Sequence, residues 1–150
     1  MFDFDYLLDL AQILFDKKDK LSVNCDIQVI YRTIINRAYY AAFNHVKTCL
    51  SLNNFKTREF DEQKGRMVNK NNKSEHILLI EELKNRAKNP ENRKYKNQLY
   101  TSSSRLKNLF DSRIDADYKE TIIFNEMDVT DSIEKSKSII NFLDFSIKIK

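Results

Sequence analysis

The chain has 150 residues, with 26 Lys and Arg against 22 Asp and Glu, two His, one Gly and one Pro. An apolar content of 41%, including ten Phe and seven Tyr, is enough for one folded domain of ordinary size. A single glycine, Gly65, excludes the glycine-rich phosphate loops of P-loop and dinucleotide-binding proteins, and it favours helices over a strand-rich fold with many tight turns.

The first third of the chain predicts two helices. An apolar stripe at helical spacing covers residues 3–16, and Asp3 or Asp5 is placed to cap its start. Apolar residues then recur every three or four positions over 26–52, which predicts a helix roughly 38 Å long. Few charges interrupt the centre of this second helix, so we expect it to be the most buried element.

The middle of the chain predicts a polar loop followed by two helices. Residues 53–74 are Asn-rich and lack periodicity, and we interpret them as a mobile loop with one short turn around Phe60. Ser74 is placed to cap a helix over 75–88, and Pro90 follows its end. A further apolar pattern predicts a helix over 96–118.

The remaining residues predict a connector and a last helix. Residues 121–125 are typical of a short extended connector, and an apolar stripe predicts a helix over 131–147, capped by Thr130 or Asp128. Neither an internal repeat nor a linker divides the sequence. We therefore expect one all-α domain over 1–150, an antiparallel bundle of four to five helices with one long polar loop.

Several classes of protein are excluded or disfavoured by local composition. No run of about 18 apolar residues exists, so we expect no membrane span. The start, MFDFDYLLDL, lacks the basic segment of a secretory signal. Cys25 and Cys49 lie far apart and have no Cys or His partners at metal-ligand spacing. We therefore predict reduced thiols, no metal site and no cofactor, in a cytoplasmic protein.

Charge is distributed unevenly along the chain. Residues 84–107 hold eight Lys and Arg against one Glu, a net charge of +7, whereas 1–31 and 109–150 each carry −3. Counterion release allows such a basic stretch to attract phosphate groups, and Lys94 and Lys96 are our candidate contacts within it. The alternative is a solvated face of a Lys-rich protein, because no aromatic stacking pattern accompanies the stretch.

Polar residues interrupt the long second helix at Asn36, Arg37 and Tyr40. In the helix over 96–118, Arg113 and Asp117 are four residues apart and therefore share a face. A buried guanidinium needs an anionic or carbonyl partner. We therefore predict that this pair meets Asn36 or Arg37, either as a ligand or catalytic site or as an interhelical network that fixes the register.

Two stretches resemble the HEPN-domain family. NRAYYAAFNHVKTCL (36–50) is similar to the second helix of these proteins, which often reads R-x-Y-Y-A-x-F. LKNLFDSRIDADY (106–118) resembles their late helix, which commonly ends in L-x-x-x-R-x-x-A-D-Y. His76, after the polar loop, resembles a histidine that a subgroup often has there. The likeness covers residues 5–145 in order, and the two motifs are its specific part.

The resemblance implies a helical bundle that usually forms a homodimer. Many HEPN proteins are ribonucleases or RNase toxins of toxin–antitoxin, CRISPR and phage-defence systems. Others are non-catalytic and bind nucleotides, RNA or a partner such as a small nucleotidyltransferase. The catalytic signature is R-x(4–6)-H near the dimer interface, where Arg polarises the phosphate and His moves the proton as the 2′-hydroxyl attacks.

The sequence departs from this signature. Arg113 matches its arginine, but Tyr118 stands where the shortest form has histidine, and no R-x(4–6)-H occurs in the chain. Tyrosine, with an ordinary pKa near 10, is a poor general base at neutral pH. RNA cleavage therefore requires the fold or a second subunit to bring His45 or His76 close to Arg113. The alternatives are a core position for His45 and a solvated helix end for His76.

The first functional hypothesis is a HEPN protein of a toxin–antitoxin or phage-defence system that acts on or binds RNA as a homodimer. Its catalytic candidates are Arg113, His76 and Tyr118, and its binding candidates, besides the two lysines, are Asn36, Arg37, Tyr40 and Asp117.

The second hypothesis is a non-catalytic helical module that binds nucleotide or pairs with a nucleotidyltransferase-type or other defence protein. This module needs an exposed apolar patch, and the first and last helices offer Phe2, Phe4, Phe142 and Phe145 for one.

Overall fold

The computed structural model describes residues 5–145 and 147–150, and most of these are helical. In chain order the elements are α1 (Asp5–Asp16), α2 (Lys18–Leu21), α3 (Ile27–Leu52), β1 (Arg58–Asp61), β2 (Arg66–Asn69), the 3-10 helix η1 (Lys70–Asn72), α4 (Glu75–Lys88), the 3-10 helix η2 (Pro90–Tyr95), α5 (Lys96–Tyr118) and α6 (Glu126–Phe142). The predicted all-α class is confirmed, apart from the small sheet formed by β1 and β2.

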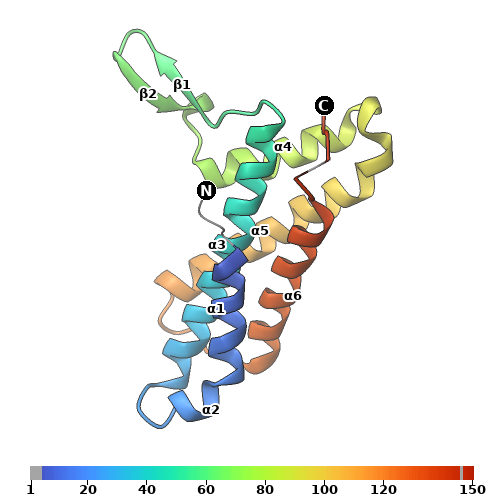
Figure 1. Ribbon diagram of the computed structural model, residues 1–150. Coiled ribbons are helices and arrows are strands. Elements are labelled where there is room, and N and C mark those ends of the chain that lie inside the picture. Colours follow the sequence, from blue (N-terminus) through green and yellow to red (C-terminus); the bar gives the residue numbers. More distant parts are fainter. Residues whose placement is uncertain (1–4, 146) are drawn as a thin grey trace.

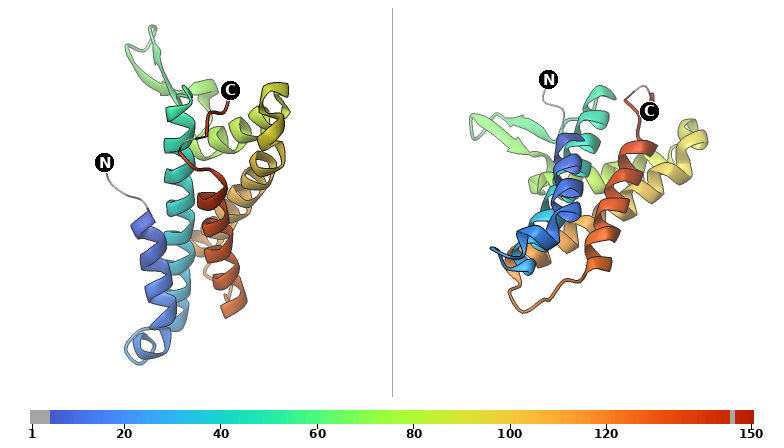
Figure 2. Two further views of the ribbon diagram at one scale, coloured as in Figure 1. Left: turned by 45° about the vertical axis from the view of Figure 1, so that its right-hand side comes forward. Right: turned by 60° about the horizontal axis from the view of Figure 1, so that its bottom comes forward.

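Helix α3 runs through the middle of the helical bundle, with α1, α5 and α6 packed around it (Figure 1). The long helices alternate in direction along the chain: α3 and α6 run toward the upper end in Figure 1, and α1 and α5 run toward the lower end. Helix α4 lies across the upper part of the bundle and packs on α5 (Figure 2). The C-terminal part of α5 lies against the N-terminal half of α3.

Two buried apolar clusters divide the length of α3 between them. The upper cluster combines the C-terminal half of α3 with α4, α5 and the end of α6, and it includes Tyr39, Leu79 and Leu106. The lower cluster combines the N-terminal half of α3 with α1, the end of α5 and the start of α6, and it includes Ile34 and Ala116. Helix α3 has thirteen buried residues, more than any other described element, as the small number of charges at its centre predicted.

Polar caps define the helix starts. The side chain of Asp26 accepts a hydrogen bond from Gln28 N (2.8 Å) at the start of α3, and Ser74 Oγ accepts one from Ile77 N (3.5 Å) at the start of α4. The predicted boundaries of α6 were wrong, since it begins at Glu126 rather than near 131 and ends at Phe142. Asn125 is its cap: a capping box with Asp128 satisfies backbone N–H groups at both positions and extends the helix upstream.

The prediction of a loop over 53–74 was also wrong in part. A two-stranded antiparallel hairpin occupies the middle of this segment, with Phe60 opposite Met67 and Asp61 opposite Arg66. Gly65 lies in the connecting turn at φ +59°, a left-handed conformation that glycine adopts without strain. Each strand has only four residues and most of them are exposed, so an alternating apolar pattern, the usual sign of a strand, is absent.

Residues 147–150, which follow α6, are held against the upper end of the bundle by hydrogen bonds from polar side chains. Arg86 donates hydrogen bonds from Nη1 to Ile149 O (2.5 Å) and from Nη2 to Asn53 O (3.0 Å), while its Nε pairs with Glu82 at 2.6 Å. Asn92 bonds Lys150 through both its amide nitrogen and its amide oxygen. Ile149 is buried as a result.

The two cysteines are both free, as predicted, with Cys25 exposed and Cys49 buried. Burial raises the pKa of the Cys49 thiol to about 11, so this thiol is protonated at neutral pH. None of the described helices combines the length and the apolar character that a membrane crossing requires.

Candidate functional site

The two motif-bearing helices meet where the sequence predicted. Asn36 on α3 donates from Nδ2 to the Asp117 carboxylate on α5, at 3.0 Å from Oδ1 and 3.3 Å from Oδ2. One turn further along α3, the Tyr40 hydroxyl accepts a hydrogen bond from Arg113 Nη2 at 3.3 Å. These contacts bridge more than seventy residues of sequence, and they confirm the predicted convergence of Asn36 with Arg113 and Asp117.

Arg113 is held from three sides. Its Nε lies 2.8 Å from Asp117 Oδ2 in an ion pair whose angle falls outside hydrogen-bond geometry. The rings of Tyr40 and Tyr118 lie 5.7 and 5.5 Å from the guanidinium carbon, within cation–π range. Burial is the largest single influence on the pKa of Arg113 and acts to lower it, but Asp117, Tyr40 and Tyr118 together outweigh burial, so the pKa is raised. The guanidinium, with its side chain 14% exposed, therefore keeps its charge.

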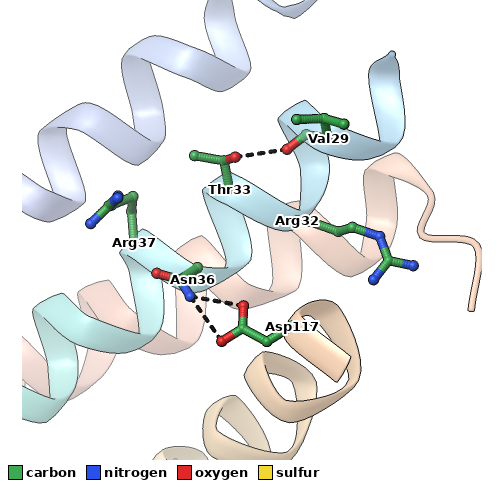
Figure 3. A pocket seen from close by; sticks show the side chains of 6 residues that line it. All are labelled: Val29, Arg32, Thr33, Asn36, Arg37 and Asp117. Atoms are coloured by element: carbon green, nitrogen blue, oxygen red, sulfur yellow. Dashed lines mark hydrogen bonds between the residues drawn. The ribbon is translucent and has the colours of Figure 1, made fainter. Parts of the chain in front are cut away.

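A pocket of about 310 Å³ opens beside this cluster (Figure 3). Figure 3 shows Asn36 turned toward Asp117, whereas the Arg37 guanidinium extends away from that carboxylate. Among residues 5–145 and 147–150, no carboxylate pairs with Arg37. The lining comprises Val29, Arg32, Thr33, Asn36, Arg37 and Asp117. Two arginines against one aspartate give the pocket a net positive charge, and Arg37 is its uncommitted cation.

His76 joins the cluster from the start of α4. Its Nδ1 is hydrogen-bonded to the Tyr39 hydroxyl, and its ring packs 4.6 Å from the Phe43 ring and 5.0 Å from the Phe110 ring, measured between centroids. Phe110 is one turn before Arg113 on α5. Burial and the nearby Arg113 charge lower the pKa of His76. The histidine ring is therefore neutral at pH 7 and has one ring nitrogen, Nε2, outside the bond to Tyr39.

We expect the Arg113→Gln substitution to raise the pKa of His76, because it removes a positive charge that disfavours imidazolium. An NMR titration of the His76 ring protons measures this directly. In the wild type, His76 of the unfolded chain binds a proton near pH 6.5. His76 of the folded chain binds a proton only at lower pH. The contribution of His76 to the free energy of unfolding therefore falls as the pH drops below about 6.5 and levels off below its folded pKa. An unchanged His76 titration in Arg113→Gln contradicts the assignment.

The other predicted site residues are placed less favourably. Tyr118 is 69% exposed and touches the cluster only through Arg113. His45 is a buried core residue, since its Nε2 donates to Leu143 O at 2.7 Å and its ring stacks on Phe145. Lys94, in η2, and Lys96, the first residue of α5, are both exposed, and Lys96 lies about 26 Å from Arg113 along α5. The two lysines therefore do not belong to the same site as Arg113.

Arg32 is the residue that sequence reasoning missed. Its Nη1 donates to Ala116 O at 2.6 Å, and its Nη2 donates to Lys119 O at 3.0 Å and to Ile122 O at 2.6 Å. These carbonyls belong to the end of α5 and the connector after it, where backbone acceptors lack helical partners. Arg32 therefore fixes the segment that carries Asp117. The only sequence signal is an arginine within an apolar helix, four residues before Asn36.

The described residues contain no group of three or more His, Cys, Asp or Glu side chains arranged to hold a metal ion. Asp115 and Asp117, which form a D-x-D pair in the sequence, have separate partners, Lys119 at 2.6 Å and Arg113. Comparison with protein-family models, with curated proteins and with solved structures finds no match to this chain.

Proposed function

We propose that this chain is a HEPN-like protein of a defence or toxin–antitoxin system that binds RNA as a homodimer and cleaves it without a metal ion. The observation that carries the proposal is the position of His76, which lies beside the Arg113 cluster within one subunit although the sequence has no R-x(4–6)-H. Arg37, which has no carboxylate partner among the described residues, adds a cation to the pocket beside the cluster and offers a counter-charge to a phosphate group there.

The proposed reaction divides the work between two residues. The Arg113 guanidinium, oriented by Asp117 and Tyr40, stabilises the charge on the phosphate as the adjacent 2′-hydroxyl attacks phosphorus. The neutral His76 ring accepts the 2′-hydroxyl proton at Nε2, which requires its Nδ1–H to donate to the Tyr39 hydroxyl. The bond from phosphorus to the 5′-oxygen of the next nucleotide breaks, and this oxygen takes a proton from a solvent water. A 2′,3′-cyclic phosphate and a 5′-hydroxyl remain, and the His76 imidazolium returns its proton to solvent.

The test is cleavage of a 5′-labelled single-stranded RNA in EDTA by the wild type and three variants. We expect cyclic-phosphate products from the wild type and a loss of about 100-fold or more for Arg113→Ala and for His76→Ala. Lys107→Ala is the matched control, because Lys107 is on α5 but pairs only with Asp111 on the surface. Thermal melts confirm that each variant is folded. Equal cleavage by wild type and Arg113→Ala removes the proposal.

A second candidate function, a non-catalytic interaction module, is favoured by an apolar stripe on α1. Tyr6, Leu10 and Ile13 share one face of this helix and are 66%, 40% and 49% exposed. Of the residues predicted for such a patch, Phe2 and Phe4 lie outside the described residues, and Phe145, although its ring stacks on His45, is 46% exposed. If RNA is neither bound nor cleaved and Arg113→Ala only lowers the melting temperature, this second function is the correct one.

A further inference from the structure

The hairpin forms one wall of a groove that is separate from the Arg113 cluster. Two adjoining depressions, of about 440 and 320 Å³, share Phe55, Lys56, Arg58 and Met67 in their walls. The hairpin extends away from the bundle beyond the upper end of α3 (Figures 1 and 2). We call this surface the hairpin groove and define it by six residues: Phe55, Lys56, Arg58, Phe60, Met67 and Lys70.

The two faces of the hairpin differ in character. Side chains of directly opposed residues share a face, so Arg58, Phe60 and Met67 lie on the groove side. Glu59, Asp61, Arg66 and Val68 alternate to the other side, where Asp61 pairs with Lys64 at 3.2 Å. Glu59 also borders the larger depression, where Lys56, Arg58 and Lys70 outnumber it three to one.

The groove face combines exposed apolar side chains with cations that have no acidic partners. Phe60 is 61% exposed and Met67 is 48% exposed, although they oppose each other across the strands. Lys70 Nζ lies 5.6 Å from the centre of the Phe55 ring. Among the described residues, no carboxylate pairs with Lys56, Arg58 or Lys70. Glu75, in the adjoining depression, is already bound by Lys47 and Thr57.

We propose that the hairpin groove binds a single-stranded nucleic acid. Exposed aromatic rings are stacking platforms for unpaired bases, and cations without carboxylate partners beside them attract the phosphates between those bases. Phe60 is the principal stacking residue, Phe55 is a second one deeper in the groove, and Lys56, Arg58 and Lys70 contact phosphates. A duplex does not fit this chemistry, because its bases are already stacked and turned inward.

The groove and the Arg113 cluster are separate sites that adjoin at the start of α4. Glu75 lines the depression next to the hairpin, and the following residue, His76, belongs to the cluster. The groove goes beyond the proposed function, because its residues are different and its binding needs no catalysis. A single-stranded nucleic acid bound in the hairpin groove would lie next to the start of α4, where His76 is located.

The experiment is fluorescence anisotropy with fluorescein-labelled 12-nucleotide oligouridylate, run with the full chain. We expect Phe60→Ala to weaken binding about fivefold or more, since stacking on one aromatic ring contributes this much or more. Arg58→Ala and Lys56→Ala should each weaken binding and make the salt dependence shallower by about one unit of slope. Arg66→Ala is the matched control on the opposite face and should change the affinity less than about twofold.

Further arms identify the ligand and separate the groove from the Arg113 site. If oligouridylate and oligothymidylate bind with equal affinity, the groove recognises bases and phosphates. If oligouridylate binds more tightly, the groove also contacts the 2′-hydroxyl groups. Either result supports the groove. In the Arg113→Ala background the Phe60→Ala effect on binding should persist. If the wild type binds oligouridylate through the groove but does not cleave RNA, only the proposed function is overturned. Equal affinity of wild type and Phe60→Ala, a preference for a blunt duplex, or binding to anionic lipid vesicles but not to the oligonucleotide overturns the groove.

Discussion

Replacing Arg32 with alanine is expected to lower the free energy of unfolding by about 3 kcal/mol, or the melting temperature by about 10 °C. The guanidinium donates to three carbonyls at 3.0 Å or less, and it also lies 5.3 Å from the centre of the Phe124 ring. Each hydrogen bond from a charged donor contributes about 1.5–3 kcal/mol, but the three bonds share one side chain and do not add. Chemical denaturation followed by circular dichroism measures the loss.

Two control variants separate the bonds of Arg32 from its charge. Arg37→Ala removes a cation one turn further along α3 that has no carboxylate partner among the described residues, and it should cost less than about 0.5 kcal/mol. Arg32→Lys keeps the charge but loses the planar fork of donors, so it should recover only part of the stability. If Arg32→Lys is as stable as the wild type, the stabilisation comes from charge rather than from hydrogen bonds to the carbonyls.

Replacing Arg86 with alanine is expected to destabilise the fold by a similar amount, about 3 kcal/mol, and to loosen residues 147–150. The Arg86 side chain is only 12% exposed, and its removal leaves the Glu82 carboxylate and the carbonyls of Ile149 and Asn53 without their donor. Ile149 and Cys49 belong to the same buried cluster. Loosening of the C-terminal residues should therefore expose Cys49 as well as lower the melting temperature.

Alkylation of Cys49 in a Cys25→Ser background is the local readout for Arg86. We expect the rate to rise by about tenfold or more in Arg86→Ala, since a local opening that uncovers the thiol becomes more populated. Arg93→Ala, at an exposed site in the neighbouring η2 helix, should leave the rate unchanged. A lower melting temperature with an unchanged alkylation rate indicates that Arg86 supports the bundle without holding residues 147–150 in place.

The sequence allowed a correct prediction wherever apolar spacing and a cap acted together. The long helices around Ile34 and Leu106 follow from apolar residues at every third or fourth position, and Ser74 marks the start of α4. The meeting of Asn36 with Asp117 was also predictable, because a polar interruption in each of two apolar helices needs a partner.

The errors and omissions share a different physical cause. Arg32 and Arg86 bind backbone carbonyls, which every residue has, so no partner is visible in the sequence. Asn125 was read as the end of a connector because the apolar stripe from which the last helix was predicted begins only at Ile133. Lys94 and Lys96 were chosen as phosphate contacts on charge alone, and charge does not indicate how far along the chain's helices they lie from Arg113.

The hairpin groove has a consequence for how this part of the chain can vary. Strands β1 and β2 hydrogen-bond only to each other in the described sheet, so no helix relies on them for backbone partners. Residues can therefore be added or removed at the tip without disturbing the bundle. A single residue inserted between Arg58 and Glu59, by contrast, would reverse the alternation beyond that point, moving Glu59 to the groove side and Phe60 away from it.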